Sequence, residues 1–128
     1  MLSAHVNGVD LSYQVYGSGR KNIIFIHGYA VQSTGGIYAP LYSYLASYFK
    51  IFALDIRGHG GSSQIIDDFT LDQVAADIVG FCELLQLHKP LFIGHSLGGT
   101  LGLLCELRKP NIFGGLVLIN PAAATGAE

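Results

Sequence analysis

Four short apolar runs, separated by stretches with a helical pattern, constrain the fold of this chain most strongly. None of the runs alternates with polar residues, which is typical of strands covered on both faces. We predict such strands at Asn22 to His27, Ile51 to Asp55, Leu91 to Gly94 and Leu116 to Asn120. Strands that alternate with helices form a parallel sheet with helices on both faces. The sequence therefore predicts a doubly wound α/β fold.

Three segments between these runs have the spacing of helices. We predict helices at about Tyr38 to Tyr48, Leu71 to Leu87 and Leu97 to Lys109. The middle one is the clearest, because Thr70 and Gln73 form a capping box at its start. Its apolar face should include Leu71 and Ile78.

The chain opens with a different pattern. Asn7-Gly8 separates two strand-like stretches, Ser3 to Val6 and Val9 to Tyr16. Asn and Gly tolerate the positive φ of a type I′ turn, so these stretches should pair as an antiparallel hairpin. With no repeat or linker elsewhere, residues 1–128 are interpreted as one domain whose mostly parallel sheet begins with this hairpin.

The composition excludes several classes of protein. Half of the 128 residues are hydrophobic and only 12% are charged, so the chain should fold rather than remain disordered. Its apolar runs are far shorter than the roughly 18 residues that span a bilayer, and we expect no membrane span. The first residues lack the basic and apolar regions of a secretory signal, which favours a cytoplasmic location.

Charges and cysteines give no sign of a special partner or cofactor. The seven Lys and Arg residues are scattered along the sequence and the formal net charge is −2, so we expect no nucleic-acid partner. Cys82 and Cys105 lack metal or redox spacing and are interpreted as reduced, buried side chains.

The segment that carries most of the chemistry is Gly94-His95-Ser96-Leu97-Gly98. It lies between a predicted buried strand and a predicted helix, which is the context of a nucleophile elbow, a sharp turn that exposes the Ser hydroxyl. The alternative is a purely structural role, in which the segment is a glycine-rich turn and Ser96 only caps the helix. A dinucleotide-binding loop would need Gly in place of Ser96.

Two further motifs follow the ends of predicted strands, where open α/β sheets build their sites. They are His27-Gly28-Tyr29 and the segment from Asp55 to Ser62, which reads D-I-R-G-H-G-G-S. A metal site of His27, His59, His95 and Asp55 is the less favoured interpretation, because metal-ligand spacing is absent. We expect no metal and no cofactor.

Together these three motifs resemble the N-terminal half of serine hydrolases of the α/β-hydrolase fold, from about Ser3 to Pro121. The resemblance implies the strand order 1-2-4-3-5-6, with Ser96 as the nucleophile. It also implies an oxyanion hole made by the backbone N–H groups of Leu97 and Tyr29. Gly28, Gly94, Gly98 and His95 would support the site, His27 would be a buried structural residue, and Asp55 and Arg57 would organise their loop.

The sequence departs from this family after Pro121. The family's triad needs an acid and then a His after the nucleophile, but the only acids after Ser96 are Glu106 and Glu128, and no His follows. His27 is a poor substitute, because the matching family residue is structural. We therefore expect a partial domain, truncated after about the sixth strand, with little activity of its own.

Two classes of function remain open. The first is a serine hydrolase that takes a small carboxylic ester, thioester or lactone and forms an acyl-Ser96 intermediate; cofactor-free haloperoxidases and C–C bond hydrolases share the same motifs. Ser at position 96 argues against the dehalogenase and epoxide-hydrolase branches, which use a carboxylate. The second is a non-catalytic module that self-associates or binds a partner through the edge strand near Leu116 to Ile119, because an uncharged apolar edge favours strand pairing.

Overall fold

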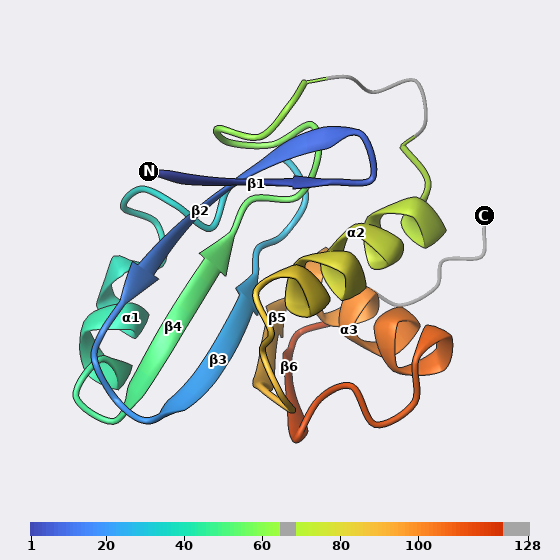
Figure 1. The fold of residues 1–128 in the computed structure, drawn as a ribbon. Helices are drawn as coiled ribbons and strands as arrows, with labels where there is room; N and C mark the ends of the chain where they lie inside the picture. The colour runs from blue at the N-terminus through green and yellow to red at the C-terminus, as the bar shows by residue number, and fades with distance from the viewer. Residues whose placement is uncertain (65–68, 122–128) are drawn as a thin grey trace.

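Six strands form a single sheet, seen in a computed structural model that describes residues 1–64 and 69–121 (Figure 1). The strands are β1 (Leu2–Val6), β2 (Val9–Tyr16), β3 (Lys21–Ile26), β4 (Phe49–Leu54), β5 (Leu91–His95) and β6 (Gly115–Ile119). Their spatial order is β1-β2-β4-β3-β5-β6. β2 runs antiparallel to β1 and β4, whereas the pairs β3·β4, β3·β5 and β5·β6 are parallel. The predicted fold class and strand order are confirmed.

The opening hairpin forms as the sequence predicts. Asn7 and Gly8 have φ values of 51° and 81°, which are those of a type I′ turn. The turn sets the register, in which Val6 pairs with Val9 and Leu2 with Tyr13.

Three helices cover the two faces of the sheet. They are α1 (Ala39–Leu45), α2 (Leu71–Leu84) and α3 (Leu97–Arg108), and α1 lies on the opposite face from α2 and α3 (Figure 1). Ile24 and Ile26 of β3 point into the core shared with α2 and α3, while Ile23 and Phe25 point into the core shared with α1. This double burial explains why the β3 sequence has no polar alternation. None of the described helices is long and apolar enough to cross a membrane.

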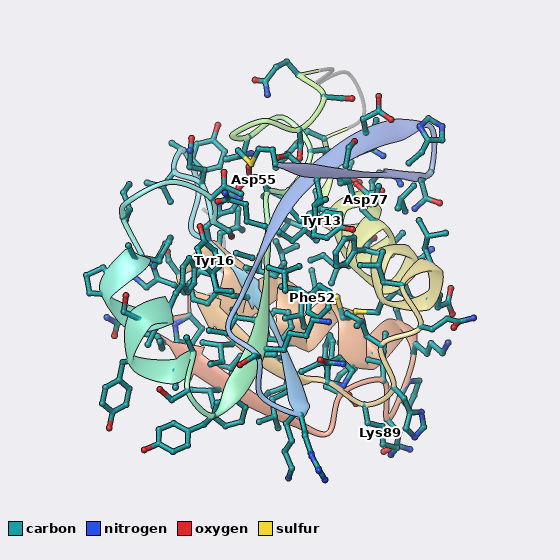
Figure 2. All side chains as sticks on the ribbon, turned by 60° about the vertical axis from the view of Figure 1, so that its left-hand side comes forward. Tyr13, Tyr16, Phe52, Asp55, Asp77 and Lys89 are labelled. Atoms are coloured by element: carbon teal, nitrogen blue, oxygen red, sulfur yellow. The ribbon has the colours of Figure 1, made fainter. Side chains whose placement is uncertain are left out.

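Aromatic side chains join the sheet to both helical layers. On one face the ring of Tyr13 lies 6.4 Å from Phe52 and 5.0 Å from Phe81 of α2, measured between ring centroids. On the other face, Tyr16 stacks on Tyr42 of α1 at 4.7 Å. Tyr13, Tyr16 and Phe52 are labelled in Figure 2.

The helices are shorter than predicted. The helix expected to reach Leu87 ends at Leu84, because Gln86 has a φ of 56° and the left-handed residue breaks the helical repeat. At its start, Thr70 accepts a hydrogen bond from the Gln73 N–H. Leu71 was expected on the apolar face, but it lies in the first turn and is 39% exposed.

Strand β6 departs from the expected burial. It lies at the edge of the sheet and, among the described strands, pairs only with β5. Leu116 and Leu118 pack on the core under α3, but Val117 and Ile119 are 53% and 39% exposed. They lie on the α1 face, where α1 packs on β3, β4 and β5 instead. The edge position was predicted correctly, and burial on both faces was wrong.

Candidate active site

Ser96 occupies a strained turn between β5 and α3. Its φ and ψ are 56° and −118°, a conformation that costs a non-glycine residue on the order of 1 to 3 kcal/mol. Small neighbours make the turn feasible: a Cβ on Gly94 would clash with the backbone of Gly98, and a Cβ on Gly98 would clash with the carbonyl oxygen of Ile26. This is the geometry that the G-x-S-x-G sequence predicts.

The Ser96 hydroxyl does not cap α3. The backbone fixes the turn, since Ser96 N–H donates to the Ile119 carbonyl at 2.9 Å and the Ser96 carbonyl accepts from Gly99 N–H at 2.9 Å. The side chain makes no cap hydrogen bond and is half-buried. The interpretation of Ser96 as a simple helix cap is therefore wrong.

The loop after β3 meets this turn. A Cβ built on Gly28 would lie 3.4 Å from the Cβ of Ser96, so the absence of a side chain at Gly28 lets the two segments approach. The N–H groups on either side of Tyr29 are occupied: Gly28 donates to the Tyr38 hydroxyl at 3.2 Å and Ala30 donates to His59 Nε2 at 3.0 Å.

One backbone N–H group in each of these two segments remains open. Within residues 1–64 and 69–121, the N–H groups of Tyr29 and Leu97 have no hydrogen-bond partner. Leu97 is the first residue of α3, where the helix dipole adds partial positive charge. The two segments that approach each other at Gly28 and Ser96 thus each carry an unused backbone donor.

Tyr38, which precedes α1, connects the two segments and was not predicted from the sequence. Its hydroxyl accepts from Gly28 N–H and lies 2.8 Å from Nδ1 of His95. The Tyr38 ring packs on Phe25, with centroids 4.5 Å apart. Tyr38 thereby ties the loop after β3 to the turn after β5. An isolated Tyr before a weak helical pattern gives no local signal of such a contact.

His27 is buried and structural. Its Nε2 accepts from the Ile56 N–H at 3.1 Å, so the proton is on Nδ1, which donates to the Gly28 carbonyl at 2.6 Å. Burial lowers the pKa of His27 to about 4. Both ring nitrogens are occupied, so this neutral His has no nitrogen free to take a proton from Ser96.

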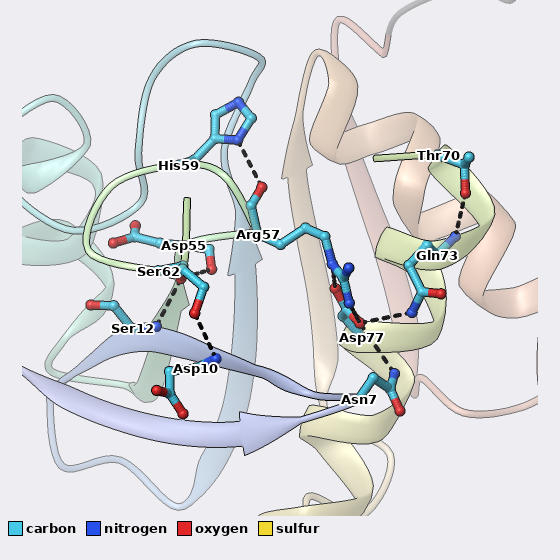
Figure 3. Close-up of polar contacts among 11 residues, drawn as sticks. Asn7, Asp10, Ser12, Asp55, Arg57, His59, Ser62, Thr70, Gln73 and Asp77 are labelled. Carbon is cyan, nitrogen blue, oxygen red and sulfur yellow. Dashed lines mark hydrogen bonds and ion pairs between the residues drawn. The ribbon is translucent and has the colours of Figure 1, made fainter. Parts of the chain in front are cut away.

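Asp55 holds the two site loops together. Its fully buried carboxylate accepts from the Ser33 and Thr34 N–H groups at 2.9 Å, from the Thr34 hydroxyl at 2.7 Å and from Gly61 N–H at 3.1 Å. The Asp55 carbonyl accepts from the Ser62 hydroxyl, which in turn accepts from Ser12 N–H (Figure 3). The carboxylate therefore fixes the loop that carries Tyr29 against the loop after β4.

Arg57 points away from its own loop toward α2. Its Nε donates to Oδ2 of Asp77 at 2.7 Å and its Nη2 donates to Oδ1 at 3.0 Å. Asp77 also accepts from the side-chain amides of Asn7 and Gln73 (Figure 3). This buried pair joins the loop after β4 to α2 and to the hairpin. The role of Arg57 in organising its own loop stays a prediction. Asp77 was missed, because an acid within an apolar helix pattern does not reveal its partner.

The histidines and acids do not form a metal cluster within the described part of the chain. His59, like His27, uses both ring nitrogens, since Nε2 accepts from Ala30 N–H and Nδ1 lies 3.1 Å from the Arg57 carbonyl oxygen. The site thus consists of a serine on a strained turn and two open N–H groups.

Comparison with known proteins places this fold and turn in a family. Residues 21–128 match the family model described as the alpha/beta hydrolase fold. The chain therefore belongs to the α/β-hydrolase family, as its three motifs predicted.

Individual relatives are enzymes. The chain is 35% identical over 114 residues to a protein of Rhizobium rhizogenes that carries the name carbamate hydrolase RutD, covering 86% of this chain and 43% of that one. It is 32% identical over 105 residues to the bifunctional esterase/perhydrolase DCH of Acinetobacter calcoaceticus, covering 82% and 38%. The solved enol-lactonase of Burkholderia xenovorans superposes with a TM-score of 0.79 at 26% identity, covering 88% and 44%. The chain thus spans less than half the length of these relatives, which are hydrolases.

Proposed function

We propose that this chain carries the nucleophile and the oxyanion-binding groups of a serine hydrolase that acts on small acyl substrates. The observation that carries this proposal is the strained turn at Ser96, with its uncapped hydroxyl and the open N–H groups of Tyr29 and Leu97 in the two segments that meet at this turn. A hydroxyl held at a sharp strand-to-helix turn next to unused donors is suited to attack on a carbonyl.

The reaction would proceed in two halves. Ser96 Oγ attacks the carbonyl carbon of an ester, thioester or lactone, and the carbonyl electron pair moves to oxygen, where the N–H groups of Tyr29 and Leu97 bind it. Each donor is worth roughly 3 kcal/mol of transition-state stabilisation. Collapse of this intermediate expels the alcohol or thiol and leaves acyl-Ser96. Water then attacks the acyl carbon, releases the acid and regenerates the serine.

Both halves need a base for the attacking hydroxyl and an acid for the leaving group. Glu106 is engaged elsewhere, because its carboxylate accepts from the N–H groups of Asn111 and Phe113, and Glu128 lies outside the described residues. His27 has no free ring nitrogen. We propose that these 128 residues alone turn over esters slowly, with acid and base supplied from outside them.

The names of the relatives support acyl chemistry of this kind. Carbamates, esters and enol-lactones are all cleaved at a carbonyl carbon, and these are the bonds that the relatives' names mention. The perhydrolase name favours a second candidate reaction on the same intermediate. Hydrogen peroxide would attack acyl-Ser96 in place of water, giving a peracid and the free serine.

Steady-state hydrolysis of p-nitrophenyl acetate tests the proposal. Nitrophenolate leaves without protonation, so the missing acid matters least with this ester. We expect turnover well below about 1 s⁻¹, lost in Ser96→Ala and retained in Ser47→Ala, which removes an exposed hydroxyl near α1. Equal rates for the chain and Ser96→Ala would contradict the proposal, and a Ser96-dependent rate above about 1 s⁻¹ would contradict the absence of a base.

The alternative of a non-catalytic module is favoured by the exposed apolar side chains of Val117 and Ile119 at the sheet edge. Such an edge favours strand pairing with a second copy of this chain. Sedimentation velocity distinguishes the alternatives. A non-catalytic module should form one defined dimer, and Val117→Lys should dissociate it into monomers. Polydisperse association, reduced by the same substitution, is the result expected for an uncovered hydrolase core.

A further inference from the structure

A pocket of about 450 Å³ lies between the loops that follow β3 and β4. Its walls are residues 29–32 of the loop after β3, residues 58–60 of the loop after β4, and Phe69. The pocket begins one residue from Gly28, which approaches Ser96. Its volume lies in the range of small-molecule sites. A group bound here would contact the same loop that approaches Ser96 at Gly28.

Three aromatic rings form a continuous wall of this pocket. The ring centroids of Tyr29 and His59 lie 5.4 Å apart, those of His59 and Phe69 5.8 Å, and those of Tyr29 and Phe69 6.5 Å. His59 and Phe69 are inclined by 35°, whereas Tyr29 stands at 73° and 74° to them. These distances and angles are those of offset and edge-to-face ring contacts. A flat ring could therefore stack on this wall.

Among the described residues that line the pocket, none carries a formal charge. His59 presents only its ring face, since Nε2 is occupied by Ala30 N–H and Nδ1 by the Arg57 carbonyl. The remaining lining residues are apolar, glycine or uncharged, with Gln32 and Tyr29 as the polar side chains. A carboxylate or ammonium group entering this pocket would lose water without meeting an opposite charge among these described lining residues. The pocket therefore favours an uncharged group.

Tyr29 belongs both to the pocket and to the proposed oxyanion hole. Its N–H has no hydrogen-bond partner among the described residues, while its side chain, 68% exposed, forms part of the aromatic wall. Binding at the wall would thus hold the loop in the position in which the N–H faces a developing oxyanion. Contacts distant from the reacting bond that orient the substrate contribute to the rate in this way.

We propose that this pocket binds an uncharged aromatic group of the acyl substrate, with Tyr29 and Phe69 as specificity-determining residues. The inference rests on the proposed function for its link to catalysis, but binding itself needs no reaction. It names aryl esters, or lactones fused to a planar ring, as the substrate class.

Binding of unreactive probes to the full chain tests this inference. The Ser96→Ala variant is titrated with acetophenone, 2-butanone and benzoate, and the backbone amides of Gly58 and Gly60 are followed by NMR. We expect acetophenone to bind at least tenfold more tightly than benzoate or 2-butanone. Tighter or equal binding of benzoate would overturn the claim of an uncharged ligand.

Side-chain variants test the wall directly. Tyr29→Ala alters an exposed side chain, and Phe69→Leu keeps an apolar contact at a partly buried site, so both should fold. Each is expected to weaken acetophenone binding about five- to tenfold. Tyr44→Ala, which removes an exposed ring on α1, serves as the matched control and should change nothing. Unchanged binding in both wall variants would overturn the inference.

The two proposals fail separately. Aryl binding in Ser96→Ala without Ser96-dependent ester cleavage in the parent chain would support the pocket and contradict the serine mechanism. Ser96-dependent cleavage without aryl binding would support the serine mechanism and contradict the proposed aromatic pocket.

Discussion

Strands β3 and β6 both contain a short apolar run, yet the two runs differ in burial. The four residues from Ile23 to Ile26 are at most 1% exposed, whereas Val117 and Ile119 of β6 are 53% and 39% exposed. β3 lies between β4 and β5 with helices on both faces, while β6 has β5 as its one described neighbour. The comparison teaches that an apolar pattern predicts a strand, but its neighbours in the sheet decide its burial.

The two strands also differ in the contacts made by the segments that follow them. β3 leads into the loop of His27, Gly28 and Tyr29, which is tied to the loop after β4 through the buried carboxylate of Asp55. Asp55 lies at the opposite end of the sheet from Lys89 (Figure 2). Substitutions at this central end should therefore cost much more stability than substitutions at the β6 edge.

The largest effect is expected for Asp55→Ala. Removing the carboxylate leaves the buried backbone N–H groups of Ser33 and Thr34, and the N–H of the exposed Gly61, without their acceptor. Because each orphaned buried donor costs about 1 to 3 kcal/mol, we expect the free energy of unfolding in urea to fall by roughly 5 kcal/mol. The exposed Asp10 provides the control, and Asp10→Ala should change the same quantity by less than about 1 kcal/mol. Equal losses for the two variants would contradict the central role of Asp55.

A matched pair of substitutions compares the strands themselves. Ile24→Ala creates a cavity in a fully buried part of β3 and should cost roughly 2 to 5 kcal/mol. Ile119→Ala removes a side chain that is 39% exposed and should cost about 1 kcal/mol or less. Urea unfolding of both variants gives the difference. A loss for Ile119→Ala as large as that for Ile24→Ala would show that β6 is covered in solution.

The third effect is a pH dependence from His27. Its pKa is about 4 in the folded chain, against about 6.5 when unfolded, so the unfolded state binds the proton more readily. Its contribution is complete above about pH 6.5 and is lost as the pH falls toward 4, a loss on the order of 3 kcal/mol. His27→Gln should be less stable at pH 7 but should lack this part of the pH dependence.

Exposed His88 supplies the control for that titration. His88→Gln should keep the full decrease in stability between pH 7 and pH 4. An unchanged pH profile in His27→Gln would refute the assignment of the titration to His27.

Much of the fold was predictable because its determinants are local. The φ preferences of Asn7 and Gly8 predict the hairpin, and unbroken apolar runs predict the parallel strands. The glycines around Ser96 predicted the sharp turn, whose strain the structure shows. In contrast, the helix end before Gln86 depends on one left-handed residue that the pattern does not mark.

The contacts that were missed are long-range. Arg57 meets Asp77 across 20 residues, and Tyr38 meets His95 across 57. The neighbouring sequence indicates neither pairing, because each contact depends on how separate elements pack together. The exposed face of β6 was missed for the same reason, since burial depends on which helix covers a strand.

The most direct test of Ser96 as the nucleophile is to locate the acyl group. The chain is incubated with p-nitrophenyl acetate, quenched in acid, digested and mapped by mass spectrometry, with Ser96→Ala and Ser47→Ala alongside. We predict acetylation of Ser96 in the parent chain and in Ser47→Ala, and none in that peptide of Ser96→Ala. Acetyl groups on lysines or other serines alone, with Ser96 unmodified, would contradict the account.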